Sequence, residues 1–255
     1  MKRNTNYLIR KSHRYLGIFI GIQFLLWTIG GLYFSWNNID DVHGDHLRKK
    51  VAFLDGAVSI ASPNPALEQL RKTNQLDSIV DIKIVNILNS PAYRITFLSG
   101  NDGLEKMALA DGSTGLLRSE LSKEEAVQIA ESLFNTNDEI VEVEYITEVG
   151  RHSEYREKPL PAWVIRFSHP DNPAIYIGAK SGTFEAIRHD TWRNFDFLWM
   201  LHTMDYEGRD IFGNYILRSF SILGLATVMS GFLLFYISSQ TLRNMKKKIH
   251  SQKIT

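Results

Sequence analysis

Two long apolar runs without a charged side chain stand near the two ends of the chain, at residues 15–36 and 219–237. At about 1.5 Å per residue, the first run makes a helix of about 33 Å, which is enough to cross the hydrocarbon core of a bilayer. It is longer than the apolar region of a signal peptide and ends in aromatic residues, including Phe34 and Trp36. The pattern therefore predicts two membrane-spanning helices, at residues 15–36 and 211–238.

Between these runs, one pattern of apolar and polar positions occurs twice, in residues 59–118 and 119–190. Each segment begins with a short amphipathic helix, at residues 63–74 and 123–134, and continues with strand-like stretches separated by Pro, Asn, Asp and Gly. Those stretches are residues 79–88, 93–98 and 106–110 in the first segment, and 140–147, 162–168 and 174–179 in the second. The repeat predicts an α+β fold, with two tandem helix-plus-antiparallel-sheet units between two membrane helices.

The remaining segments are a juxtamembrane linker at residues 37–58, an interfacial helix at residues 191–210, and tails at residues 1–14 and 239–255. The interfacial helix is predicted from aromatic and histidine residues that recur every three or four positions and would share one helical face. These residues are Trp192, Phe195, Trp199, His202 and Tyr206.

Both tails are basic and contain no acidic residue, although the formal net charge of the whole chain is only +1. Basic residues beside membrane helices favour the cytoplasm, so both termini are predicted to be cytoplasmic and residues 37–210 periplasmic, in a bacterial inner membrane. The reversed topology is the alternative. A nucleic-acid-binding protein would gather basic charge on a folded face, so the lipid bilayer, and no nucleic acid, is the predicted partner.

The chain contains no cysteine. This excludes disulfides, iron–sulfur clusters, thiolate zinc sites, covalently attached c-type haem and cysteine nucleophiles. Histidine and carboxylate chemistry remains, and b-type haem needs only imidazole ligands. The sequence has no phosphate-binding glycine loop, no nucleophile elbow and no His-Glu-x-x-His motif.

Several motifs resemble a known family. The stretch LSKEEAVQIAESLF, followed by a strand pair and a strand that ends in a glycine-bearing turn, resembles a PepSY domain; residues 59–118 are the more divergent copy. The membrane segments resemble the PepSY-associated transmembrane group, whose first helix opens with a His-Arg-aromatic-Leu-Gly pattern, found here at residues 13–17. A later helix in that group carries a Leu-His pair ahead of a Ser-Gly-aromatic run, found here at residues 201–202 and 230–232.

Some members of this group are inner-membrane reductases of ferric siderophores that bind b-type haem through membrane histidines. The resemblance therefore implies haem b at His13 and His202, and electron transfer linked to periplasmic iron reduction and iron uptake. His202 would take its second ligand from His43 or His46, or each histidine would pair with its copy in a homodimer. Electrons would come from a redox partner or from quinone. Because the larger reductases have more spans, it stays open whether this chain is itself a haem-dependent ferric reductase component.

Two other functions compete with this one. The chain could be a non-enzymatic, membrane-tethered PepSY module that inhibits a peptidase or senses a ligand. Alternatively, carboxylates and imidazoles of the juxtamembrane linker could bind a divalent metal, and the predicted ligands are Asp41, His43, Asp45 and His46. The same four residues would otherwise be a polar linker. Three further histidines between the spans, His152, His169 and His189, are expected to be ordinary surface residues.

Overall fold

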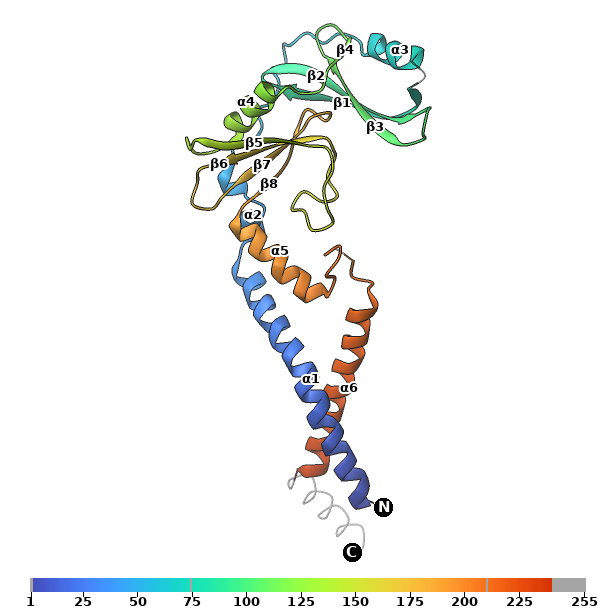
Figure 1. The fold of residues 1–255 in the computed structure, drawn as a ribbon, viewed down its shortest axis with the longest axis vertical. Coiled ribbons are helices and arrows are strands. Elements are labelled where there is room, and N and C mark those ends of the chain that lie inside the picture. The colour runs from blue at the N-terminus through green and yellow to red at the C-terminus, as the bar shows by residue number, and fades with distance from the viewer. Residues whose placement is uncertain (1, 74, 210, 240–255) are drawn as a thin grey trace, which may run out of the picture. The chain divides into compact units, whose positions relative to one another are not determined.

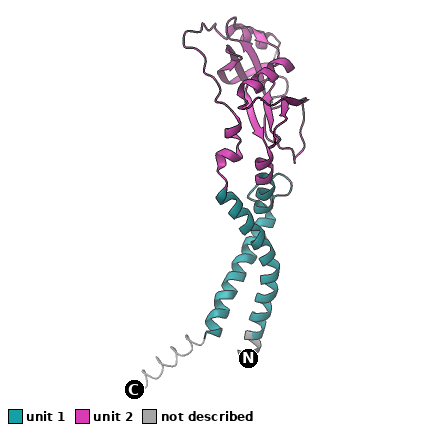
Figure 2. Ribbon diagram, turned by 90° about the vertical axis from the view of Figure 1, so that its left-hand side faces the viewer, with its two compact units in different colours: residues 1–36, 196–255 teal, residues 37–195 magenta. Residues whose placement is uncertain are grey.

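The computed structural model describes residues 2–73, 75–209 and 211–239, so most of the predicted basic tail at 239–255 lies outside the described residues. The chain divides into two compact units, which Figure 2 colours separately. We call residues 1–36 with 196–255 the helical unit, and residues 37–195 the sheet unit.

The helical unit is built on α1 (Lys2–Trp36) and α6 (Tyr215–Ser238). The segments Tyr7–Trp36 and Tyr215–Ser238 are each long and apolar enough to cross a membrane. The helices pack on each other, and the rings of Phe19 and Phe220 stack with centroids 5.3 Å apart. The helix α1 also includes the predicted N-terminal tail, because residues 2–14 contain no proline or glycine that would end a helix.

The predicted interfacial helix is shorter in the structure, where α5 covers Asp190–Thr203. Met204 has a φ of +52°, and the Asp205 carboxylate then accepts hydrogen bonds from the backbone N–H groups of Glu207 and Gly208. This turn ends the helix, so Tyr206 does not share its aromatic face.

The sheet unit contains two four-stranded antiparallel sheets, which confirms the predicted α+β fold (Figure 1). After two short helices, α2 (Ile39–Val42) and the 3₁₀ helix η1 (Asp45–Leu47), each sheet follows one longer helix. The first set comprises α3 (Asn64–Lys72), β1 (Leu76–Ile87), β2 (Ser90–Ser99), β3 (Glu105–Asp111) and β4 (Leu117–Arg118). The second comprises α4 (Lys123–Leu133), β5 (Ile140–Ile146), β6 (Ala162–Phe167), β7 (Ala174–Gly178) and β8 (Phe184–Arg188). Within each sheet, consecutive strands pair.

The predicted capping box at the start of α4 is present. The Glu125 N–H donates to the Ser122 hydroxyl at 3.2 Å, and the Ser122 N–H donates to the Glu125 carboxylate at 3.0 Å. Arg118 donates to both oxygens of the same carboxylate. The start of α4 is therefore fixed by reciprocal bonds that the spacing of Ser122 and Glu125 predicts.

The repeat extends to the turn after the third strand of each sheet. Gly115 in the first turn and Gly182 in the second have φ values of +73° and +69°, a conformation that favours glycine. A Cβ atom on Gly115 would lie 2.1 Å from the Ser62 carbonyl oxygen, so this turn also needs a residue without a side chain.

The cores of the two sheets differ in what covers them. The helix α3 packs on one face of the first sheet through Ala66, Leu67 and Leu70. The helix α4 belongs to a larger cluster that takes Ile87, Ala92 and Leu109 from the first sheet, and Ile165, Phe167, Ile175, Ile177 and Ile187 from the second. On the opposite face of the second sheet, Tyr155 from the β5–β6 loop packs on Tyr176 and Val164.

Candidate functional site

His13 lies where α1 contacts α6. Its Nδ1 is 2.7 Å from the hydroxyl oxygen of Ser230, and that hydroxyl donates its single proton to the Thr227 carbonyl. The His13 Nδ1–H is therefore the donor to Ser230, and Nε2 carries the free lone pair. A Cβ atom on Gly231 would lie 3.3 Å from His13 Cε1, so the Ser230-Gly231 pair both binds and accommodates the imidazole.

His202 lies in an aromatic cluster near the end of α5. Its ring centroid is 5.9 Å from that of Trp27, 5.8 Å from Phe34 and 6.4 Å from Trp199. The Trp27 indole N–H donates to the His202 carbonyl at 3.0 Å and so fixes the backbone there. The His202 Nδ1 atom is buried and has no hydrogen-bond partner among the described residues.

The structure keeps these two histidines apart. His13 lies on α1 itself, while His202 packs beside Gly30 and Phe34 of the same helix. Gly30 follows His13 by seventeen positions, which corresponds to about 25 Å along an α-helix. The two imidazoles therefore lie near different ends of the helical unit, and they cannot bind one iron within a monomer.

The four predicted metal ligands lie in α2, η1 and their junction. His46 Nδ1 is 3.7 Å from an Asp41 carboxylate oxygen, whereas Asp45 pairs with Arg48 at 2.6 Å. His43 caps α2 through its backbone N–H, and its side chain is exposed. Across the described residues, no three His, Cys, Asp or Glu side chains form a group that could hold a metal ion. The metal site at these four residues stays a prediction.

His189 is not the surface residue that was expected, because its side chain is fully buried. Its Nε2 lies 3.0 Å from the Asp41 carbonyl oxygen and 3.2 Å from that of Val42, so it carries the proton that is donated. Its Nδ1 is buried without a partner among the described residues. Burial, followed by the neighbouring His46, lowers the pKa of His189. His189 thus attaches the linker after α1 to the junction of β8 and α5.

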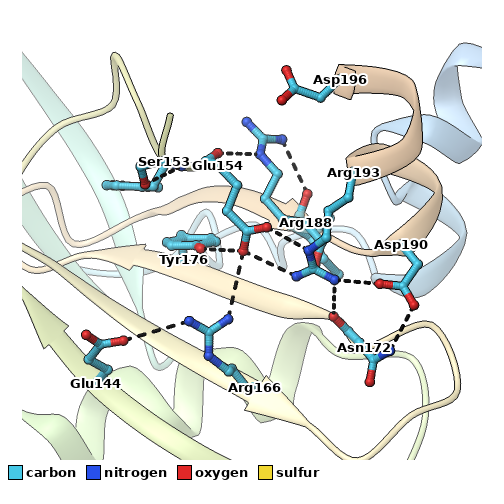
Figure 3. A network of polar contacts seen from close by, with 12 residues as sticks. Glu144, Ser153, Glu154, Arg166, Asn172, Tyr176, Arg188, Asp190, Arg193 and Asp196 are labelled. Atoms are coloured by element: carbon cyan, nitrogen blue, oxygen red, sulfur yellow. Dashed lines mark hydrogen bonds and ion pairs between the residues drawn. The ribbon is translucent and has the colours of Figure 1, made fainter. Parts of the chain in front are cut away.

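A polar network covers the face of the second sheet that is opposite α4 (Figure 3). Glu154, from the loop between β5 and β6, accepts hydrogen bonds from Arg193 Nε at 2.7 Å, Arg193 Nη2 at 3.2 Å and the Tyr176 hydroxyl at 2.7 Å. Arg166 forms a longer ion pair of 3.8 Å with Glu154. Arg193 also donates to Asp190 and to the Asn172 carbonyl, both at 2.9 Å.

The network holds Glu154 in its charged form. Burial raises the pKa of Glu154, but the hydrogen bonds from Arg193 and Tyr176 and the positive charges of Arg193 and Arg166 more than offset this, so the net pKa is lowered. Burial, together with the Glu154 charge, raises the pKa of Tyr176, which therefore stays a hydrogen-bond donor. Nothing in the sequence indicated this network, because Glu154 lies in a turn-rich loop and its partners are distant in the chain.

An open cleft of about 680 Å³ adjoins this network. Its wall combines apolar residues such as Ile146 and Val164 with the charged groups of Glu144, Glu154 and Arg166. The terminal nitrogens of Arg166 reach Glu144 and Glu154 only at 3.8 Å. The cleft is large enough for a small molecule or for a few residues of a peptide, and it offers charges of both signs.

The comparisons with known proteins give one family. Residues 120–188 match the family model described as "Peptidase propeptide and YPEB domain", which is named PepSY. A comparison with curated proteins and one with solved structures gave no match. The matched residues run from just before α4 through β8 and include the network around Glu154. Residues 120–188 are therefore a PepSY domain, on a chain with one apolar helix near each end that is long enough to cross a membrane.

Proposed function

We propose that this protein is an inner-membrane PepSY protein that binds b-type haem and transfers electrons outward for the reduction of ferric siderophores in iron uptake. The observation that carries this proposal is His202, whose Nδ1 is buried in a cluster of aromatic rings and has no hydrogen-bond partner in the described part of the chain. Leaving a buried polar atom unpaired costs about 1–3 kcal/mol, so such an atom calls for a ligand or another explanation.

The topology in this proposal rests on charge. Basic residues and no acids precede the first apolar segment and follow the second. Both ends are then cytoplasmic, and the sheet unit with its PepSY domain is periplasmic. His13 would lie near the cytoplasmic face and His202 near the periplasmic face, which are the two positions that an electron path across the bilayer requires.

One imidazole at each end of the helical unit would hold a haem. His13 presents a lone pair on Nε2, His202 has a nitrogen free of structural hydrogen bonds, and Trp27, Phe34 and Trp199 supply an apolar, aromatic surround for a macrocycle. The helical unit contains no other histidine among its described residues. We propose that a second copy of the chain supplies the other imidazole, through a two-fold axis.

A bound haem would supply one-electron chemistry at each face. The residues of this chain would orient the imidazoles and exclude water: Ser230 fixes the His13 ring, and the Trp27 indole fixes the backbone of His202. The chain shows no nicotinamide or flavin motif, so we propose that a redox partner or quinone delivers the electrons.

The test is an absorption spectrum of the purified full-length protein, oxidised and dithionite-reduced, with a pyridine haemochrome assay. We expect a Soret band and reduced α and β bands that are weakened in each of the single variants His202→Ala and His13→Ala and lost in the double variant. The matched control is His152→Ala, which removes an exposed histidine of the sheet unit and should leave the spectrum unchanged. A spectrum with protein absorption alone, from cells supplied with haem, would refute the proposal.

The cleft beside Glu154 favours a second function, a membrane-tethered PepSY module that binds a peptide or another ligand without redox chemistry. Mixed charges and apolar walls are common in peptide-binding and ligand-binding sites. A photocrosslinking residue placed at Glu148, which lines the cleft, tests this function. A partner captured there, but not from the exposed position Asn101 of the other sheet, would support it. Equal labelling from both positions would argue against it.

A further inference from the structure

A second cavity lies in the sheet unit, between the half that contains the first sheet and the half that contains the second sheet. It has a volume of about 650 Å³ and is lined by residues 49–54, by the end of β1, by α4 and by the start of β8. Residues 49–54 follow η1 and have no regular secondary structure. The backbone N–H of Lys49 donates to the Leu133 carbonyl at the end of α4, and the Asn86 amide donates to the Ala52 carbonyl at 2.8 Å. The segment is thus attached on both sides of the cavity.

The lining of this cavity combines apolar side chains with positive charge. Most of its wall is apolar and comes from both halves of the sheet unit: Ile84, Val85, Leu88, Ile129, Leu133 and Phe184. Among the residues that the structure describes, its charged lining residues are Lys49 and Lys50, and none of its lining residues is acidic. Both lysines are exposed, and neither has an ion pair within the described part of the chain.

One polar atom of the wall also lacks a partner. The Asn86 Oδ1 atom is buried and accepts no hydrogen bond from any described residue, although the Asn86 amide nitrogen is engaged with Ala52. A buried acceptor without a donor is uncommon in folded proteins. Since Asn86 lines the cavity, a ligand with a hydroxyl or amide group could satisfy it.

We propose that this cavity binds a free amphipathic anion, with an acyl or aryl body on the apolar wall, a hydroxyl or amide donor on that body for Asn86, and a carboxylate or similar group at Lys49 and Lys50. Apolar walls contribute affinity by burial, and the two ammonium groups select the sign of the headgroup. A cationic amphiphile would meet two like charges and no carboxylate. The volume lies within the usual range for small-molecule sites. The proposal concerns the sheet unit and does not depend on haem.

The experiment uses the full-length protein in nanodiscs of zwitterionic lipid and a photoreactive decanoate, with the labelled peptides identified by mass spectrometry. We expect saturable labelling of residues 49–54 and of α4. Unlabelled decanoate should compete best, decanol about fivefold less well because it lacks the charge, and decyltrimethylammonium least of the three. The double variant Lys49→Ala/Lys50→Ala should weaken binding about fivefold, because two partly exposed ion pairs contribute modestly. Ser132→Trp, at an exposed lining position, should block the cavity.

The control is Lys83→Ala, which removes a lysine of β1 that pairs with Asp81 and does not line the cavity. Its labelling should equal that of the unchanged protein. Equal labelling in the double-lysine variant, or labelling confined to α1 and α6, would overturn the proposal. Nanodiscs that contain anionic lipid should not suppress the labelling; if they do, a lipid headgroup is the occupant, and the assignment to a free ligand is wrong.

Discussion

Replacing Glu154 by alanine is expected to destabilise the sheet unit by about 3 kcal/mol. The carboxylate accepts two hydrogen bonds from Arg193 and one from Tyr176, and its side chain is only 21% exposed. Hydrogen bonds to a charged group contribute about 1.5–3 kcal/mol each, but they are not additive. Arg193 would keep Asp190 and the Asn172 carbonyl, which limits the loss to the lower end of the range for a broken buried pair.

One further variant tests the contribution of the Glu154 charge, and another serves as a control at an exposed ion pair. Glu154→Gln keeps an acceptor for Tyr176 and Arg193 but removes the charge, so it should cost about half as much as the alanine variant. Glu142→Ala is the matched control, because Glu142 also pairs with an arginine, Arg166, at 2.9 Å, but is 57% exposed. Exposed pairs of this kind contribute about 0–1 kcal/mol.

Pulse proteolysis of the full-length protein across a urea series measures these differences, since it detects unfolding of the sheet unit while the apolar helices stay in detergent. An alanine variant at Glu154 that loses no more stability than Glu142→Ala would refute the assignment of Glu154 as the centre of the network.

The contribution of Glu154 to the unfolding free energy is expected to decrease at low pH. The pKa of Glu154 is lowered from its ordinary value of 4.5, so its contribution to stability is complete above pH 4.5 and is lost as pH falls through the folded-state value. The difference in unfolding free energy between the unchanged protein and Glu154→Gln should therefore shrink on acidification below that pH. A difference that stays constant down to pH 3 would contradict the reasoning.

Three other substitutions test local features by the same unfolding assay. Ser122→Ala removes the capping box of α4 and should cost about 1 kcal/mol; a loss below 0.3 kcal/mol, on the order of experimental error, would contradict this. Gly44→Ala should cost at least about 2 kcal/mol, because φ is +78° and the new Cβ would lie 2.5 Å from Ile187 Cγ2. Trp163→Phe should cost about 1 kcal/mol through loss of the 2.9 Å indole bond to the Leu121 carbonyl, and an unchanged midpoint would exclude that bond as a source of stability.

The elements that the sequence predicted well are those with a strong local signal. The two long apolar helices could be predicted from the length of the apolar runs and their lack of charged residues alone. The helix α4 could be predicted from its capping box and from a regular apolar stripe of Ala126, Ile129, Ala130 and Leu133. Its observed span, Lys123–Leu133, differs from the prediction by one residue. The strand-like stretches predicted at residues 140–147, 162–168 and 174–179 correspond to β5, β6 and β7.

The polar sites could not be predicted in this way. Glu154 and Arg193 are 39 positions apart, and only the fold brings them together. His189, near the close of the second repeat, was expected at the surface, yet the linker around Val42 and Gly44 packs on it. In both cases the deciding contact is between segments distant in the chain, and a single sequence carries no local signal for it.

The sequence repeat also gives no indication of how the two sheets of the sheet unit pack together. The family model covers residues 120–188, but the core of that region includes Ile87, Ala92 and Leu109 from the preceding copy. The first sheet uses one face for α3 and part of the other for the cluster around α4, which requires apolar residues on both faces of β2. Residues of β2 therefore contribute to two clusters, Ala92 to the one around α4, and Tyr93, Ile95 and Phe97 to the one under α3. It also follows that residues 120–188 cut from the chain would expose part of their core, so the two copies form one folded body.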